Sequence, residues 1–240
     1  MTILAWQRGG APTGPAVVLA HDWAADASWW QDTGWVEGLE AAGLAVFVPD
    51  LPGHGESADV LVPPDTEPSA WTANAILADL SRLRVDSLAA VGYRMGALVA
   101  GHLAVRAPDQ VRRLVIVGCD DGAVLERGSD VAAALRDPSA ALWNADASAA
   151  VSRARNDRRH HLPTLAQWAE SAAWPAAPRL GALRTPVLLA IGQDDPRRQR
   201  APRLAALFHD GHLVTAPGDD TTAVVGAEMV NAVASFLSGT

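Results

Sequence analysis

The chain has 240 residues, of which 49% are hydrophobic and 19% charged. This composition supplies ample apolar material for a folded core and excludes a disordered chain. The formal net charge of −8 argues against a nucleic-acid partner and an anionic membrane surface, because both require a basic face. Cys119 is the single cysteine, which excludes a disulfide framework and a cysteine-based zinc cluster. No secretory leader or long apolar run is visible, so we expect a cytoplasmic monomer or homodimer.

Short apolar runs, most of them unbroken, alternate with helical patterns along the chain. Such runs are typical of strands buried on both faces of a parallel sheet. The alternation predicts an α/β fold with a mostly parallel, doubly wound sheet flanked by helices, in which ligands bind at the carboxyl ends of the strands. The expected strands are 17–20, 45–48, 88–91, 111–117, 186–191 and 212–216, and the expected helices are 71–83, 95–106, 201–208 and 221–237.

One long segment interrupts this rhythm. Residues 119–183 contain several helix-like patterns and no strand pattern, and a segment of this length is too long for an ordinary loop. We therefore predict a core formed by residues 1–118 and 184–240, with 119–183 as a helical cap. Tryptophans are frequent in this cap and are suited to walling a pocket for a flat or aromatic ligand. They are Trp143, Trp168 and Trp174.

Three motifs follow the first three buried strands. They are His21-Asp22-Trp23, then Pro-Asp-Leu-Pro-Gly-His-Gly-Glu-Ser at 49–57, then Val-Gly-Tyr-Arg-Met-Gly-Ala at 91–97. In this order they resemble the α/β-hydrolase fold superfamily, where they correspond to the oxyanion loop, the Asp-x-x-Gly-x-Gly-x-Ser turn and the nucleophile elbow Gly-x-Ser-x-Gly. The resemblance is greatest to the capped esterases, lactonases and C–C hydrolases, and it implies a helical cap over the same sheet.

The elbow motif departs from the family at its central residue. Gly92 and Gly96 keep the two positions where a strand turns so sharply into a helix that side chains would collide. Arg94 stands where the family has its nucleophile, and a guanidinium stays protonated and cannot attack a carbonyl. Tyr93 and Met95 flank Arg94 and are expected at the pocket.

The resemblance also assigns the other two triad positions. The strand at 186–191 is followed by Gly-Gln-Asp-Asp, which places the acid at Asp195, with Asp194 as the other register. The loop after the last strand reads Pro-Gly-Asp-Asp, which places the histidine position at Asp220, or at Asp219 with a one-residue slip. The acid position is therefore kept, while the nucleophile and the base are both replaced.

A third departure lies in the oxyanion loop, where Asp22 replaces the family's glycine beside His21 and Trp23. A carboxylate there would oppose a developing oxyanion. An unpaired arginine under a cap is costly, so we expect Arg94 to pair with Asp220, Asp195 or both. Three interpretations of this cluster stay open: a structural ion pair in a dead site, an arginine that binds a ligand oxygen, and an aspartate base with Arg94 as electrophile.

These departures exclude a conventional serine hydrolase and leave open whether the chain is an enzyme. The leading expectation is a non-hydrolytic protein, either a small-molecule-binding pseudoenzyme or an enzyme of the lyase, isomerase or cyclase type. Its ligand would be apolar or aromatic with a carbonyl or anionic oxygen, and no cofactor or metal is expected. The alternatives are a hydrolase of an ester, lactone or C–C bond with an unrecognised nucleophile, and a non-catalytic interaction protein. An open pocket of several hundred Å³ would favour ligand binding over the interaction protein.

Overall fold

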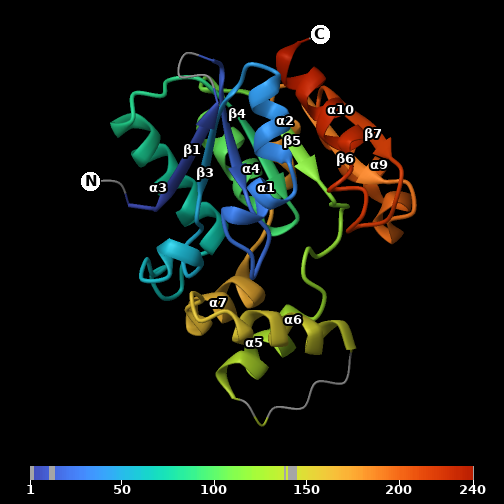
Figure 1. The fold of residues 1–240 in the computed structure, drawn as a ribbon. Helices are drawn as coiled ribbons and strands as arrows, with labels where there is room; N and C mark the ends of the chain where they lie inside the picture. The colour runs from blue at the N-terminus through green and yellow to red at the C-terminus, as the bar shows by residue number, and fades with distance from the viewer. Residues whose placement is uncertain (1–2, 11–13, 138, 140–144, 240) are drawn as a thin grey trace.

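The computed structural model describes residues 3–10, 14–137, 139 and 145–239. Its centre is a seven-stranded sheet in the order β1-β3-β2-β4-β5-β6-β7, in which only β1 runs antiparallel to its neighbour (Figure 1). This confirms the predicted mostly parallel α/β sheet. The strands are β1 Trp6–Gly10, β2 Ala16–Ala20, β3 Ala45–Pro49, β4 Leu88–Tyr93, β5 Val111–Val117, β6 Val187–Gly192 and β7 Gly211–Ala216.

The sequence patterns missed strand β1. Its sequence, Trp-Gln-Arg-Gly-Gly, lacks an apolar run because β1 is an edge strand that pairs with β3 alone. Trp6 packs edge-on against Phe47 of β3, with ring centroids 6.5 Å apart. The carboxylate of Asp79 accepts hydrogen bonds from the Trp6 indole and from the backbone N–H groups of Ile3 and Leu4, which fixes the start of the chain against the core.

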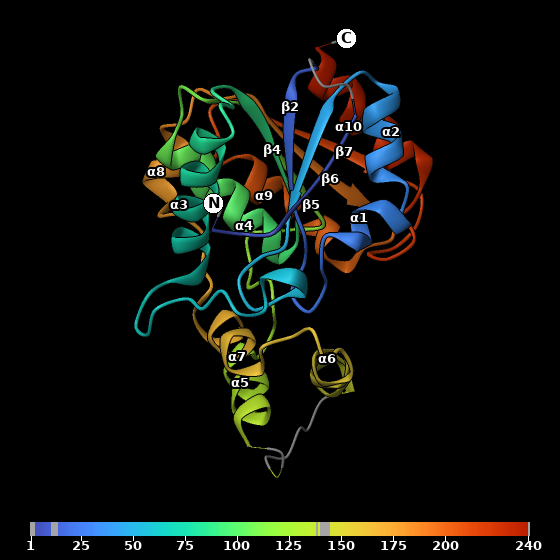
Figure 2. The same ribbon diagram turned by 60° about the vertical axis from the view of Figure 1, so that its left-hand side comes forward.

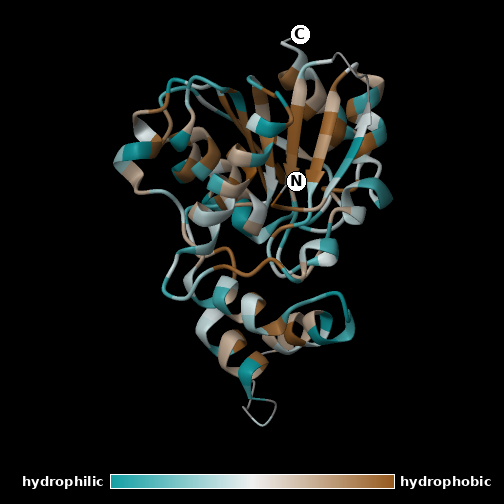
Figure 3. Ribbon diagram, turned by 90° about the vertical axis from the view of Figure 1, so that its left-hand side faces the viewer, coloured by the Kyte–Doolittle hydropathy of each residue, from teal (hydrophilic) through white to brown (hydrophobic). Residues whose placement is uncertain are grey.

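Helices cover both faces of the sheet (Figure 2). One apolar cluster packs α1 (Ser28–Asp32), α2 (Trp35–Ala41) and α10 (Ala227–Ser238) on one face. The other packs α3 (Pro68–Arg82), α4 (Met95–Arg106), α8 (Ala177–Gly181) and α9 (Ala201–Ala205) on the opposite face. The most hydrophobic ribbon lies in the strands between these layers (Figure 3), as expected for a sheet buried on both faces.

Three helices between β5 and β6 lie beyond this three-layer body: α5 (Gly128–Arg136), α6 (Ala145–Asn156) and α7 (Leu162–Ser171) (Figures 1 and 2). Helix α7 is tied to the core by a backbone hydrogen bond from His161 to Gly53 at 2.8 Å. The described part of 119–183 contains no strand, and the division at residues 119 and 183 into core and cap stays a prediction.

Two short 3₁₀ helices complete the described secondary structure, at Gly55–Ser57 in the glycine-rich turn and at Pro196–Gln199 after β6. Within the described ranges, no helix is both long and apolar enough to cross a membrane.

Candidate functional site

The turn from β4 into α4 has the predicted elbow geometry. Arg94 adopts φ 48° and ψ −109°, a backbone conformation that residues other than glycine rarely adopt and that concentrates at functional sites. A Cβ atom at Gly92 would collide with the backbone of Gly96, and one at Gly96 would collide with Ala20 of β2. Both glycines are therefore required for α4 to leave the sheet so sharply, and the turn presents Arg94 at the carboxyl end of β4.

Two carboxylates flank the Arg94 guanidinium, whose side chain is 20% exposed. Asp220 Oδ2 lies 3.6 Å from Arg94 Nη2, and Asp22 Oδ2 lies 3.9 Å from Arg94 Nη1. Burial alone lowers the pKa of Arg94, but the negative charges of Asp22 and Asp220 outweigh it and raise that pKa above its ordinary value. Arg94 is therefore a permanent cation whose ion pairs are loose enough to admit a ligand oxygen.

Asp195 pairs with a second arginine, Arg197, which the sequence reasoning missed. Arg197 Nη1 lies 3.2 Å from Asp195 Oδ1 and 3.4 Å from Asp220 Oδ2. Asp195 also caps the short helix at 196–199 by accepting the backbone N–H of Arg197. The Asp195 side chain is fully buried, and its Oδ2 has no hydrogen-bond partner among the described residues. Arg197 thus bridges the acid position and the histidine position, and Arg94 meets Asp220 but not Asp195.

The structure also distinguishes the two uncertain registers. Asp219 Oδ1 accepts hydrogen bonds from the hydroxyl and backbone N–H groups of Thr222 and Thr221. These bonds hold the pKa of Asp219 well below its usual range, and they fasten its carboxylate within its own loop. Asp194 is exposed. The residues brought to the site are therefore Asp195 and Asp220.

The side chain of Asp22 accepts a hydrogen bond from a backbone N–H that hydrolases of this fold use for catalysis. Its Oδ1 accepts the backbone N–H of Met95 at 3.1 Å, and the N–H after the elbow residue is one half of the usual oxyanion hole. His21 holds this loop from behind: its Nε2 accepts from Leu51 N at 3.0 Å, and its Nδ1 donates to the Asp22 carbonyl at 2.8 Å. His21 is fully buried and its pKa is lowered by that burial, so it supports the loop as a neutral ring and does not reach a ligand.

Tyr93 acts in the same supporting way. Its hydroxyl donates to the backbone carbonyl of Asp220 at 2.9 Å, and its ring stacks on Trp29 at 4.9 Å between centroids. Burial raises the pKa of this phenol, so it stays protonated. Tyr93 therefore positions the loop that carries Asp220.

Cys119 lies next to the elbow, with its Sγ 3.6 Å from the Arg94 carbonyl oxygen. Its thiol is buried, and this burial raises its pKa. Because the thiolate is the nucleophilic form of cysteine, Cys119 does not supply the nucleophile that the elbow lacks. Within the described residues, no cluster of histidine, cysteine, aspartate or glutamate could hold a metal ion.

An open pocket of about 410 Å³ lies over Arg94, within the range of small-molecule sites. By the criterion stated above, it favours a ligand-binding site over an interaction protein. Both apolar and charged side chains line it. Its apolar residues are Trp23, Met95, Val124, Leu125, Ala147, Ala149, Ala150 and Pro196, and its charged residues are Asp22, Arg94, Glu126, Arg153, Arg197 and Asp220.

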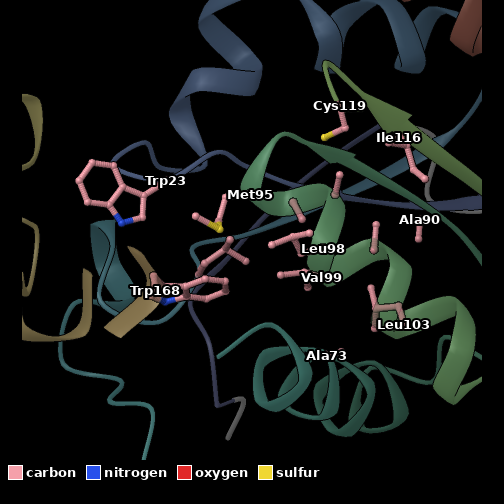
Figure 4. Packing of buried hydrophobic residues seen from close by; sticks show 14 of the residues in the cluster. Trp23, Ala73, Ala90, Met95, Leu98, Val99, Leu103, Ile116, Cys119 and Trp168 are labelled. Atoms are coloured by element: carbon pink, nitrogen blue, oxygen red, sulfur yellow. The ribbon is translucent and has the colours of Figure 1, made fainter. Parts of the chain in front are cut away.

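The structure does not bring the cap tryptophans that it describes to this pocket. Trp168 is fully buried and its indole donates to the Pro52 carbonyl at 3.1 Å, which fastens the ring to the glycine-rich turn. Trp174 packs against α4 beside Gly101. Trp143 lies outside the described residues. Among the described residues, Trp23 from the core is the tryptophan that lines the pocket, and Met95 points toward the rings of Trp23 and Trp168 (Figure 4).

Two curated relatives are pimeloyl-[acyl-carrier protein] methyl ester esterases. The one from Vibrio campbellii is 36% identical over 126 residues, which are 52% of this chain and 44% of that protein. The one from Vibrio parahaemolyticus is 39% identical over 116 residues, which are 48% of this chain and 40% of that protein. The chain therefore spans less than half the length of these relatives.

The activity named for these relatives corrects the leading expectation from the sequence. Both are esterases, which contradicts the non-hydrolytic and pseudoenzyme interpretations and agrees better with the alternative of a hydrolase. Losing the serine and histidine of a triad does not remove every route to hydrolysis. A carboxylate can activate water, and a fixed cation can stabilise an oxyanion.

Solved structures agree with the fold. A hydrolase from Pseudomonas aeruginosa superposes with a TM-score of 0.71 at 20% identity, covering 96% of this chain and 91% of that one. The family model described as alpha/beta hydrolase fold matches residues 15–146, more than half of the sequence. Together with the elbow at Arg94 and the mostly parallel sheet, this match shows that the chain belongs to the alpha/beta hydrolase fold family.

Proposed function

We propose that this chain hydrolyses a neutral carboxylic ester, with water as the nucleophile, Asp220 as the general base and Arg94 as the oxyanion donor. The observation that carries the proposal is the 3.6 Å approach of Asp220 to Arg94 on the wall of a pocket of about 410 Å³. These residues stand at the base and nucleophile positions of a fold whose relatives are named as esterases.

Asp220 is suited to take a proton from water. Its Oδ2 faces the guanidinium groups of Arg94 and Arg197, and its Oδ1 has no hydrogen-bond or ion-pair partner among the described residues. The side chain is 31% exposed and lines the pocket, so a water can reach the free oxygen. A positioned general base contributes about 10²–10⁴-fold to a rate.

Arg94 takes the place of the usual oxyanion hole. Because Asp22 already accepts the Met95 N–H, the guanidinium of Arg94 is the strong donor that remains beside the substrate carbonyl. A preorganised cation at a developing negative charge is among the largest contributions to catalysis.

The reaction then proceeds in two steps. Asp220 accepts a proton from water while the water oxygen bonds to the carbonyl carbon, and the carbonyl oxygen becomes an oxyanion next to Arg94. The carbon–oxygen bond to the alcohol breaks, and the departing alkoxide takes the proton from Asp220. The products are the carboxylic acid and the alcohol.

Arg197 and Asp195 have a positioning role in this proposal. Arg197 holds Asp220 at 3.4 Å, in the region where a triad histidine would stand, and the buried Asp195 holds Arg197 at 3.2 Å. Arg197 is paired with Asp195, and Arg94 is paired with Asp220. Each arginine is therefore neutralised by a carboxylate, and neither requires a bound anion.

The pocket favours a neutral, apolar substrate. Three arginines and three carboxylates line it, so their formal charges cancel, and the rest of the wall is largely apolar. The names of the relatives make methyl esters of acyl chains the first substrate class to test. Asp22 and Asp220 would repel the carboxylate product and so favour its release.

A panel of p-nitrophenyl esters and methyl octanoate tests the proposal. We expect turnover, together with no stoichiometric labelling by a fluorophosphonate, because the elbow carries no serine. Asp220→Asn should lower kcat at least 10²-fold, while Asp194→Asn, an exposed neighbour of the acid position, should leave it unchanged. Absence of turnover across the panel, or equal activity of Asp220→Asn and the parent, would overturn it.

A further inference from the structure

A second cavity lies at the end of the sheet opposite to Arg94. It is formed by the first residues of β2 and β4, the start of β3 and the end of α10, and its volume is about 420 Å³. This is as large as the pocket over Arg94, and it is in the range of small-molecule sites. The proposed reaction makes no use of it.

The cavity has an apolar wall. Val17, Leu44 and Leu88 are almost completely buried at its floor, and Phe47 and Leu237 continue the wall toward its rim. Such a wall binds the hydrocarbon or aromatic part of a ligand by removing apolar surface from water.

Three arginines are among the residues that line this cavity. Arg84, Arg112 and Arg113 all line the cavity, and Asp86 is the single carboxylate among its lining residues. None of the three arginines forms an ion pair with a carboxylate that the structure describes. The cavity therefore has an excess of positive charge on a chain whose formal net charge is −8.

Arg84 has a strained backbone conformation at the cavity. Arg84 follows the end of α3 with φ +58°, and its N–H and that of Val85 close the helix by donating to Ser81 and Leu80. Glycine is strongly favoured at this position, because a side chain in the left-handed region is strained. The chain therefore keeps an arginine at a position whose backbone conformation favours glycine.

Arg113 packs against an aromatic ring. Its guanidinium lies 5.1 Å from the centroid of the Phe236 ring, within the range of a cation–π contact. A preordered guanidinium loses less conformational entropy when it binds a planar anion such as a carboxylate.

We infer that this second cavity binds an amphiphilic anion, with an apolar body against Val17, Leu44 and Leu88 and one carboxylate held by Arg84, Arg112 and Arg113. Guanidinium groups recognise carboxylates through paired, charge-assisted hydrogen bonds. The inference does not depend on the proposed hydrolysis, because no residue of this cavity lines the pocket over Arg94.

A structural role for the arginines gives a different expectation. The carboxyl-terminal ends of α3 and α10 lie at this cavity and carry partial negative charge. If Arg84 served only to neutralise the end of α3, Arg84→Gly would lower Tm. If Arg84 is kept for a ligand, Arg84→Gly should leave Tm equal or raise it, because glycine relieves the strained backbone.

Calorimetric titration with sodium octanoate tests the inference, with octan-1-ol as the neutral control. We expect octanoate to bind at least tenfold more tightly than octanol, and high salt to weaken binding. Arg84→Gly and Arg112→Ala should each weaken octanoate at least fivefold, with Tm of Arg84→Gly equal or higher. Arg106→Ala, an exposed arginine outside the cavity, should bind like the parent.

Changes in backbone amide NMR chemical shifts distinguish binding in this cavity from binding in the pocket over Arg94. Octanoate should move the signals of Leu44, Ser87 and Leu237, and it should do so in the Asp220→Asn variant as well. Equal binding of octanol and octanoate, unchanged affinity in Arg84→Gly, or shifts confined to Met95 and Thr221 would each overturn the inference.

Discussion

The carboxylate of Asp22 accepts the backbone N–H of Met95 at 3.1 Å, so a negative charge lies against the first N–H after the elbow residue. In a hydrolase of this fold, that N–H follows the nucleophile and faces the substrate oxygen. The proposed ester hydrolysis must therefore rely on Arg94. Replacing Asp22 therefore tests whether the oxyanion is stabilised by the Arg94 guanidinium alone or also by a freed Met95 N–H.

Asp22→Gly should raise kcat for a p-nitrophenyl ester by roughly tenfold. The change frees the Met95 N–H for the oxyanion while Arg94 stays in place, and a single oxyanion donor is worth about 10²–10³ in kcat when it is well placed. Steady-state kinetics of the purified variant measure the effect. A collapse of activity would instead indicate that Asp22 is the general base.

Arg94→Met should reduce kcat at least 10²-fold and reduce stability. The methionine keeps the apolar stem but leaves Asp22 without its cation and leaves Asp220 paired with Arg197 alone. Because the guanidinium is partly exposed, we expect a loss of roughly 1–3 kcal/mol, between the values for surface and buried pairs. Urea unfolding and ester kinetics check both effects, and Arg198→Met, an exposed arginine, serves as the control. Parental kcat in Arg94→Met would contradict the role of Arg94.

Arg197→Met should lower kcat about tenfold with little change in KM. Arg197 contacts Asp220 and Asp195, so its loss misplaces the base while the pocket walls stay in place. Arg197→Lys should recover part of the rate, because a lysine can still pair with one of the two carboxylates. A change confined to KM would place Arg197 in substrate binding instead.

Stability should fall as the pH drops below about 6.5, the ordinary histidine value. Burial lowers the pKa of His21 and His54, whose rings lie 5.1 Å apart. Above the unfolded pKa both states are neutral and the full stability is present. Below it the unfolded chain binds protons that the folded chain rejects. Two such groups give a slope of at most about 2.7 kcal/mol per pH unit.

Urea unfolding at pH 7.5, 6.5 and 5.5 measures this slope. His54→Gln should reduce it, whereas His209→Gln, which changes an exposed histidine, should not. A flat stability profile across this range would show that the two buried rings do not resist protonation.

The fold was predictable because its signals are local. Unbroken apolar runs marked β2, β3, β4 and β6, interrupted ones marked β5 and β7, and the glycines at 92 and 96 marked the elbow by sterics alone. Strand β1 escaped because an edge strand needs no continuous apolar run.

The site was predictable only where the family motif fixes a position, as at Arg94 and Asp220. The role of Arg197 depends on a turn that Asp195 caps, and the contact of Asp22 with Met95 joins segments 73 residues apart. Neither relationship leaves a pattern in the sequence. Trp168 appeared suited to a pocket wall, but its indole found a carbonyl partner at Pro52 inside the core.

A single-turnover reaction in H₂¹⁸O, with enzyme in excess over a p-nitrophenyl ester, tests the central claim most directly. If Asp220 activates water for direct attack, the released acid carries ¹⁸O in the first turnover, and the protein carries none. If a protein carboxylate attacks instead and water then opens the resulting anhydride at the protein carboxyl carbon, the acid released in the first turnover carries ¹⁶O from that carboxylate. Mass spectrometry of the peptides with Asp22 and Asp220 then shows ¹⁸O in one of them. The account predicts the first result, and the second would contradict it.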